Sequence, residues 1–181
     1  MAQEDDLEPD WVGPTHQSLL DAGVGIVGHV PDGGLRHLIT RVEHDHRITT
    51  VRLSTEEEGV ALAAGAWLGG VRTAVLMQSS GVGNCINMLS LLRTCAVPTV
   101  FLVTMRGQGG ESNPWQVPMG SVADQALELM GVEVRSVSSV DAVAAAVARS
   151  AAEAFGPTPR ATAVLIEQQV IGAKQFAGDR P

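Results

Sequence analysis

The segment LSTEEEGVALAAGAWLGG, residues 53–70, decides how the rest of the chain is interpreted. Three consecutive carboxylates, Glu56, Glu57 and Glu58, begin an uncharged, alanine-rich run that predicts a helix over residues 56–69. Acids in a first turn stabilise a helix through its dipole, which explains two of them without invoking any ligand. Successive helix residues point about 100° apart, so the three acids cannot share one environment. At least one is expected to face the ligand edge of the protein or its core.

Outward from this helix, short apolar runs alternate with helical patterns along the chain. The expected strands cover residues 24–30, 48–53, 73–78, 98–105, 132–138 and 161–168. The expected helices cover residues 35–45, 56–69, 83–94, 121–130 and 140–155. This order predicts a single three-layer α/β domain with a mostly parallel six-stranded sheet flanked by helices. We expect the domain over residues 14–170, between a loose N-terminal arm at 1–13 and a C-terminal tail at 171–181.

Composition narrows the class of protein. The chain has 181 residues, a formal net charge of -8 and 45% hydrophobic residues, which can fill a core and argues against disorder. The acidic balance and the lack of a basic cluster argue against binding to nucleic acid or to an anionic membrane surface. No apolar run reaches the roughly 20 residues that span a bilayer, and the acidic first residues do not resemble a secretion signal. We expect a cytoplasmic protein with some apolar surface buried against another subunit.

Three segments are expected at the ligand edge, because ligands of parallel sheets lie beyond the carboxyl ends of the strands. They are STEEEG (54–59), SSGVGN (79–84) and RGQGG (106–110). Gly81 and Gly83 permit a tight strand-to-helix turn and close approach of the backbone to a ligand. A turn with glycines for geometry alone is an equally good explanation. The segment is neither a P-loop nor a complete dinucleotide fingerprint.

The long irregular segment 106–121 is a second candidate, since long ordered loops tend to be functional. It contains Arg106, Trp115 and Gln116. Arginine suits bidentate recognition of a carboxylate, phosphonate or sulfonate, although loop packing with a surface arginine explains the residue as well. No Cys/His cluster supports a zinc site, and no Gly-x-Ser-x-Gly elbow marks a serine nucleophile.

Four ordered blocks carry a family resemblance: residues 55–70, 77–92, 97–110 and 116–120, the last reading QVPMG. Together they resemble the pyrimidine-binding domain of thiamine-diphosphate enzymes. The likeness is greatest to the separately encoded alpha subunit of sulfopyruvate decarboxylase and to the related phosphonopyruvate decarboxylase. It covers residues 25–166 and is densest over 53–120.

The resemblance assigns Glu56 as the catalytic acid, because the family's glutamate lies nine residues before a glycine that here is Gly65. In the family this glutamate bonds N1′ of the cofactor's aminopyrimidine, which promotes loss of the C2 proton, and the cofactor is then the electron sink for decarboxylation. The expected cofactor-binding residues are Glu56, Ser80, Gly81, Gly83 and Asn84. The expected substrate-binding residues are Arg106, Gln116 and Asp32, the last in a VPDGG turn that has Gly33 where the family has serine.

The diphosphate half of such enzymes carries a Gly-Asp-Gly segment followed by asparagine, which holds Mg²⁺, and this sequence lacks it. The resemblance therefore implies half a cofactor site, a beta-type partner subunit that binds the diphosphate and Mg²⁺, and a hetero-oligomer. The implied activity is decarboxylation of a small anionic 2-oxoacid, sulfopyruvate first and phosphonopyruvate as the alternative. A non-catalytic binding or regulatory module with the same fold is the alternative from another class.

Overall fold

A single sheet organises the computed structural model, which describes residues 7–172. Its six strands lie in the order β2-β1-β3-β4-β6-β5. The strands are β1 Val24–His29, β2 Thr49–Arg52, β3 Arg72–Gln78, β4 Thr99–Thr104, β5 Glu133–Val137 and β6 Ala161–Ile166. Every neighbouring pair is parallel, so the expected α/β fold is confirmed and the sheet is parallel throughout.

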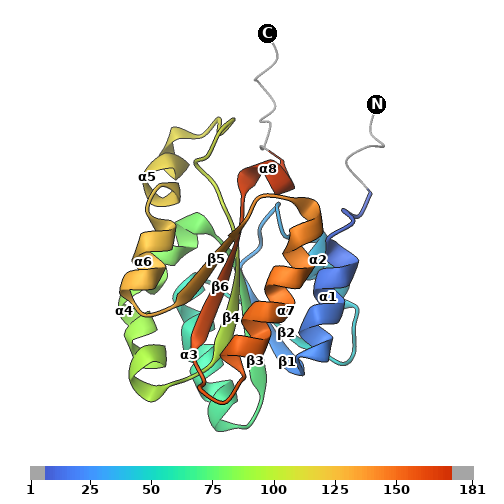
Figure 1. Cartoon of the computed structure of the whole chain (residues 1–181), viewed down its shortest axis with the longest axis vertical. Coiled ribbons are helices and arrows are strands. Elements are labelled where there is room, and N and C mark those ends of the chain that lie inside the picture. The colour runs from blue at the N-terminus through green and yellow to red at the C-terminus, as the bar shows by residue number, and fades with distance from the viewer. Residues whose placement is uncertain (1–6, 173–181) are drawn as a thin grey trace.

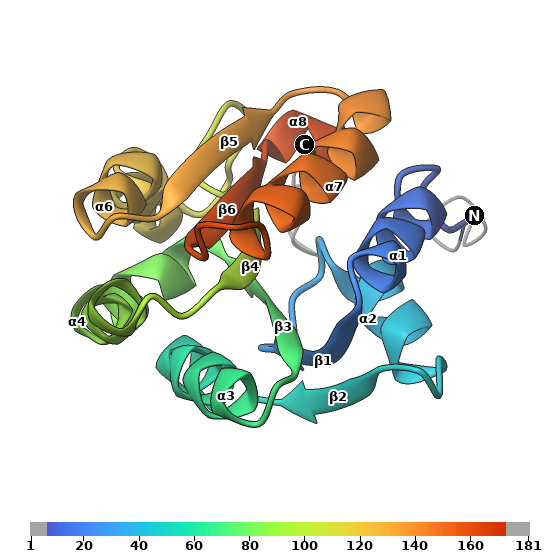
Figure 2. The same ribbon diagram turned by 60° about the horizontal axis from the view of Figure 1, so that its bottom comes forward.

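Helices cover both faces of the sheet (Figures 1 and 2). They are α1 Val12–Asp21, α2 Arg36–Glu43, α3 Glu56–Leu68, α4 Ser79–Cys95, α5 Val117–Gly120, α6 Ala123–Leu129, α7 Val143–Ala154 and α8 Gln168–Ile171, with 3-10 turns η1 Pro114–Gln116 and η2 Val140–Ala142. One buried cluster joins α1, α2 and α7 to one face, and a second joins α3, α4 and α6 to the other. Three layers result, as expected.

Burial along the strands follows their place in the sheet. All six positions of β4 and all six of β6 are buried, whereas β2 at the edge has no buried residue. Strands covered by helices on both faces need side chains that avoid water at every position, and this explains their uninterrupted apolar sequences. The uninterrupted apolar runs of the sequence therefore mark the strands in the interior of the sheet.

The chain changes face between β1 and β3, which are neighbours in the sheet. From β1 it passes through α2 on one face to β2, and from β3 it passes through α4 on the opposite face to β4. The two connections therefore diverge beyond the carboxyl ends of the two strands, which is the position where open parallel sheets bind their ligands.

Four helices differ from the sequence expectation, and three of them, α1 and the short helices α5 and α8, were not expected at all. Helix α1 begins at Val12, and Trp11 and Val12 are 3% and 0% exposed, although both lie within the range expected as a loose arm. Helix α4 begins at Ser79 rather than near residue 83, so the SSGVGN segment is its first turns and not a loop. Of the expected tail, residues 173–181 lie outside the described part of the chain.

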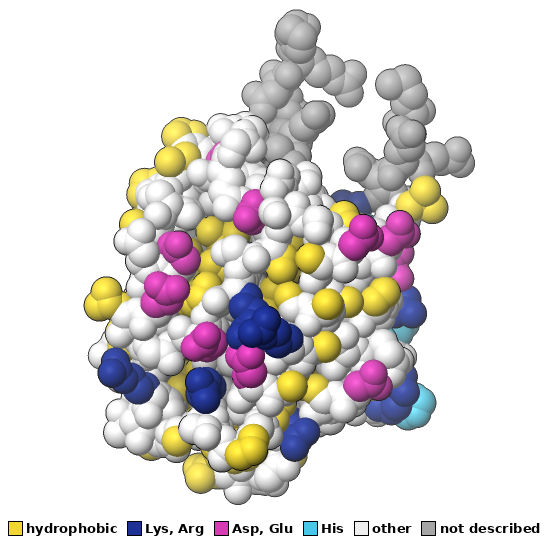
Figure 3. Space-filling model, in the orientation of Figure 1, with side chains coloured by type: hydrophobic (Ala, Val, Ile, Leu, Met, Phe, Trp, Pro, Cys, Tyr) yellow, Lys and Arg dark blue, Asp and Glu magenta, His cyan; other side chains and the backbone are white. Residues whose placement is uncertain are grey.

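Surface charge, helix length and the two cysteines can each be compared with what the sequence led us to expect. On the face shown in Figure 3, basic side chains stand in small groups between acidic ones and form no continuous basic stripe. Among residues 7–172, no helix is both long and apolar enough to cross a bilayer. The two cysteines, Cys85 and Cys95, are both free, as expected from their spacing on one helix.

Candidate active site

Five polar side chains follow the carboxyl ends of five strands. Asp32 follows β1, Glu56 follows β2, Ser79 follows β3, Arg106 follows β4 and Gln168 follows β6. All five are buried, with between 0% and 8% of each residue exposed. A parallel sheet brings these ends to one edge, so the site is assembled from segments far apart in the sequence.

Glu56 is the first residue of α3 and is 7% exposed. Its carboxylate does not turn outward to solvent, because it packs against the start of α4. The Asn84 side-chain amide donates a hydrogen bond from Nδ2 to Glu56 Oε2, at 2.8 Å. The resemblance placed both residues at the cofactor, and the structure brings them into direct contact.

Gly81 makes this contact between helices possible. A Cβ atom at position 81 would lie 2.3 Å from Cγ, 2.4 Å from Cδ and 2.5 Å from Oε1 of Glu56. Real Cβ atoms do not come so close to another side chain, so any larger residue would displace the carboxylate. Gly81 is not among the glycines with a positive φ. It is therefore explained by the approach of Glu56 and not by a tight turn.

The three consecutive acids divide into separate roles, as their angular spacing predicts. Glu58 Oε2 accepts a hydrogen bond from the backbone N–H of Ser54, at 2.7 Å. This bond holds the residues that precede α3 against its first turn. Glu57 is exposed to solvent. Glu56 alone is buried against another element. The first turn of α3 thus contains two solvent-exposed glutamates and one buried glutamate.

Cys85 lies one residue beyond Asn84 and is 1% exposed. Burial raises the pKa of the Cys85 thiol to about 12, and the nearby charges of Glu56 and Glu57 raise it further in the same direction. The thiol stays protonated at neutral pH. Since the thiolate is the nucleophilic form, Cys85 contributes packing and not nucleophilic chemistry.

Arg106 does not stand free at the ligand edge. Its Nε and Nη2 donate to Glu111 Oε2 and Oε1 at 2.7 and 2.8 Å, which is a bidentate ion pair. The guanidinium of Arg106, together with backbone N–H groups of Gly107 and Asn113, lowers the pKa of Glu111 to about 2. The charge of Arg106 is therefore already offset within the protein, and its expected role toward substrate stays a prediction.

Gln168 ties this ion pair to the neighbouring strand. Its Nε2 donates to Glu111 Oε2 at 3.0 Å, its Oε1 accepts from the Gln108 backbone N–H at 2.9 Å, and its backbone N–H donates to Gln108 Oε1 at 2.7 Å. These hydrogen bonds join the connection after β4 to the first turn after β6. Sequence reasoning did not find Glu111, Gln108 or Gln168. The last expected strand, 161–168, was drawn too long, because β6 ends at Ile166 and Gln168 begins α8.

Segment 106–121 folds back upon itself. A Cβ at Gly107, whose φ is +77°, would lie 2.5 Å from the backbone oxygen of Gln116, and a Cβ at Gly120 would lie 1.9 Å from that of Arg106. The RGQGG and QVPMG blocks therefore pack backbone to backbone, as near neighbours at the ligand edge. Gln116 Oε1 is buried and has no hydrogen-bond partner among the described residues.

Asp32 has a structural set of partners. Its Oδ2 accepts from the backbone N–H groups of Gly34 and Leu35 at 3.0 and 3.2 Å and from Thr104 Oγ1 at 2.8 Å. These bonds close the turn before α2 and join it to the end of β4. Ser80 and Gly83 lie in the first turns of α4, and a Cβ at Gly83 would be 3.1 Å from Met119 Sδ. Helix α5 therefore covers part of the expected cofactor surface.

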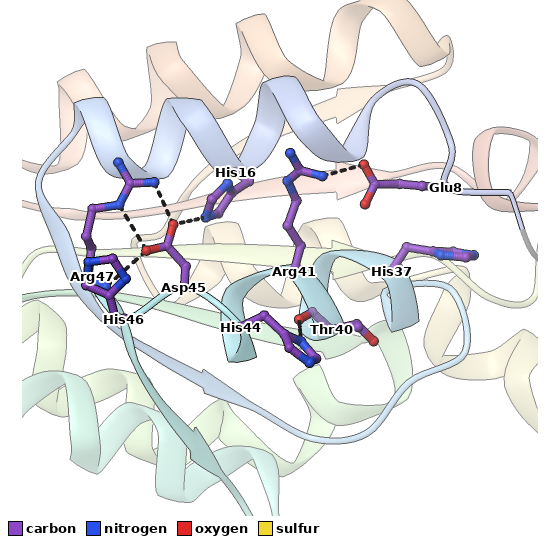
Figure 4. A pocket seen from close by; sticks show the side chains of 9 residues that line it. All are labelled: Glu8, His16, His37, Thr40, Arg41, His44, Asp45, His46 and Arg47. Atoms are coloured by element: carbon purple, nitrogen blue, oxygen red, sulfur yellow. Dashed lines mark hydrogen bonds and ion pairs between the residues drawn. The ribbon is translucent and has the colours of Figure 1, made fainter.

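A separate hollow of about 620 Å³ lies away from these residues, beside α1 and α2 (Figure 4). Arg41 is paired with Glu8 and Arg47 with Asp45, each at 2.7 Å, so the charges of the hollow are matched internally. It contains none of the side chains at the carboxyl edge of the sheet. Its lining residues are Glu8, His16, His37, Thr40, Arg41, His44, Asp45, His46 and Arg47.

Within residues 7–172, no group of three or more His, Cys, Asp or Glu side chains is arranged to hold a metal ion. At the ligand edge the enclosed carboxylate of Glu56, to which the Asn84 amide donates, is instead a group that can take up or release a proton.

Comparison with known proteins gives close relatives of defined activity. The chain is 36% identical to the alpha subunit of sulfopyruvate decarboxylase from Methanocaldococcus jannaschii over 115 residues, which cover 63% of this chain and 68% of that protein. It is 36% identical to the same subunit from Methanothermobacter thermautotrophicus, over 74% of this chain and 81% of the relative. A phosphonopyruvate decarboxylase from Streptomyces viridochromogenes is 39% identical, and the match covers 64% of this chain and 30% of that protein.

The fold also recurs in a solved structure. The 2-oxoglutarate:ferredoxin oxidoreductase from Magnetococcus marinus matches with a TM-score of 0.67 at 14% identity, over 94% of this chain and 34% of that one. A comparison with models of known protein families found no match.

Proposed function

Because the chain belongs to the family of sulfopyruvate decarboxylase alpha subunits, we propose that it is the pyrimidine-binding half of a thiamine-diphosphate-dependent 2-oxoacid decarboxylase. The observation that carries the proposal is the carboxylate of Glu56, enclosed at the mouth of α3 and held against the first turns of α4. An acid in such a position can exchange a proton with a ring nitrogen while water is excluded.

The residues present fit the aminopyrimidine of thiamine diphosphate. Glu56 would hold the proton at N1′, and Ser80 and Gly83 would form the surface beside the ring, since a glycine lets a flat ligand approach the backbone. Gly81 would serve the site by leaving the space that the Glu56 carboxylate occupies. When bound, the cofactor supplies an electron sink for the carbon–carbon bond that breaks. The contribution of this chain is to orient the ring and to move one proton.

The diphosphate and Mg²⁺ would be bound mainly by a beta-type partner subunit, in a cytoplasmic hetero-oligomer. Two observations support a partner. The relatives are named as alpha subunits. In addition, large hydrophobic side chains are exposed on the elements that cover the α3–α4–α6 face and its loop: Leu68, Leu91, Trp115, Val117, Val122 and Leu129. Among the described residues, these are six of the eight large hydrophobic side chains that are exposed, and Leu7 and Val140 lie on other segments. A concentration of exposed apolar side chains marks an interaction surface.

The substrate we propose is sulfopyruvate, a short 2-oxoacid with a second anionic group. The support is the naming of three alpha-subunit relatives at 35–36% identity. Phosphonopyruvate is the second candidate, since two decarboxylases of that substrate match at 38–39% identity. Arg106, Gln116 and Asp32 are proposed for the substrate side. Arg106 would act through a guanidinium that Glu111 already holds in place.

The test is to co-express the chain with a beta-type partner and to measure decarboxylation of sulfopyruvate, phosphonopyruvate and pyruvate. The expected result is thiamine-diphosphate-dependent release of carbon dioxide, with the highest kcat/KM for sulfopyruvate. Preference for phosphonopyruvate would reassign the substrate within the same chemistry. A stable complex that binds the cofactor and decarboxylates none of the three would contradict the proposed function.

A further inference from the structure

We propose that Asn84 is a positioning residue for Glu56: its amide fixes one carboxylate oxygen, and the bare backbone of Gly81 sets the position of the other. The proposal rests on the proposed function, in which Glu56 exchanges the proton. It goes further because it assigns Asn84 to the carboxylate and not to the cofactor itself.

The geometry comes from one face of α4. Gly81 and Asn84 are three residues apart and therefore neighbours on the helix surface. Asn84 Nδ2 lies 2.8 Å from Glu56 Oε2. On the same face, the missing side chain of Gly81 leaves the space that Cγ, Cδ and Oε1 of Glu56 occupy. The two residues thus hold the carboxylate from two sides, although 28 positions separate Asn84 from Glu56 in the chain.

The contact has a chemical consequence. The Asn84 amide is a hydrogen-bond donor to Glu56 Oε2. Removal of the amide should free the Glu56 carboxylate to leave its position against α4. Replacement of the amide by a second carboxylate should displace the Glu56 carboxylate further, because two like charges at hydrogen-bond distance repel each other. A purely structural asparagine on an exposed turn would produce neither change.

The experiment follows the carboxyl carbon of Glu56 by NMR in the isolated full chain labelled at glutamate, at constant neutral pH. Loss of one signal in Glu56→Gln identifies the residue. The carboxyl-carbon signal of Glu56 is expected to move in Asn84→Ala, which loses the donor at Oε2, and to move further in Asn84→Asp, which adds a repelling charge. Asn87→Asp is the matched control, because Asn87 is exposed on the next turn of α4 and receives the same charge.

Two outcomes would overturn the proposal. In the first, the Glu56 signal in Asn84→Ala and in Asn84→Asp stays at its wild-type position. In the second, Asn87→Asp moves the Glu56 signal as much as Asn84→Asp does, which would reveal a general charge effect. Because no cofactor or partner is needed, the result is independent of the proposed function. That function fails separately if the Glu56→Gln complex retains wild-type turnover.

Discussion

Arg106 and Glu111 form a bidentate ion pair in which the two side chains are only 6% and 2% exposed. The pair joins the second residue of the connection after β4 to a residue five positions further along it. Gln168, in the turn after β6, donates a further hydrogen bond to Glu111. Because both charges are buried, removal of either side chain would leave the other charge without its ion-pair partner. The same contact that positions Arg106 at the ligand edge also keeps segment 106–121 folded.

Glu111→Gln should lower the free energy of unfolding by about 3–5 kcal/mol, because it removes the carboxylate that pairs directly with the buried guanidinium of Arg106. Urea denaturation of the isolated chain measures the loss. The control is the double variant Arg106→Met/Glu111→Gln, which also removes the guanidinium. We expect it to be more stable than Glu111→Gln alone. A loss below about 1 kcal/mol in the single variant would show that the pair behaves as a surface ion pair.

The same carboxylate predicts how the fold responds to strong acid. The pKa of Glu111 is about 2, below its usual value of 4.5, because Arg106 and two backbone N–H groups stabilise the charged form. Its contribution is therefore complete above pH 4.5 and is lost as the pH falls from there toward 2. Urea denaturation between pH 6 and pH 3 should show this loss in the wild type. Glu111→Gln should show a smaller decline over the same range, and equal declines would contradict the assignment.

A buried histidine predicts a second loss, nearer neutrality. Burial lowers the pKa of His29 from its usual 6.5, an effect only partly offset by the carboxylate of Glu43, whose Oε1 lies 3.3 Å from His29 Nε2. The unfolded chain then binds the proton first, so stability falls as the pH decreases through 6.5. His29→Gln should be less sensitive between pH 7.5 and 5.5, measured by urea midpoints. His46→Gln, at an exposed position, should keep the wild-type dependence.

Gly81→Ala tests the fit between α3 and α4. The added Cβ would overlap the Glu56 side chain, so we expect the carboxylate to move while the chain still folds. A displacement of about 1 Å at a reacting group can lower turnover about 100-fold. Gly65→Ala is the control, since Gly65 also lies within a helix and a Cβ there would meet nothing within 4 Å. Circular dichroism and turnover of the assembled complex separate the outcomes, and equal turnover in the two variants would refute the role of Gly81.

The sheet could be predicted because its signal is local. The apolar runs that become β3, β4 and β6 are uninterrupted, and burial on both faces requires that. Helix α1 was missed because Gly13 and Pro14 interrupt its pattern, although proline is tolerated in a first helical turn. The start of α4 was placed too late because Gly81 and Gly83 were interpreted as turn residues. In the structure they are helical.

The site was only partly predictable, for a different reason. Glu56 could be selected by its spacing from Gly65 within a family resemblance, and its burial agrees with that choice. The partners of the site residues could not be predicted. The Asn84–Glu56 contact joins two helices, and the Arg106–Glu111 pair depends on how an irregular segment folds. Such contacts depend on tertiary packing, which leaves no periodic trace in the sequence.

The most direct test of the central claim is exchange of the C2 proton of bound thiamine diphosphate for deuterium, followed by NMR in the assembled complex. If Glu56 is the acid at N1′, Glu56→Gln should slow exchange by about 10²–10⁴-fold, because glutamine keeps the size of the side chain and loses the proton. Glu57→Gln and Glu58→Gln remove equal charge from the same helical turn and should exchange as the wild type does. Wild-type exchange in Glu56→Gln, or loss of exchange in either neighbour instead, would contradict the account.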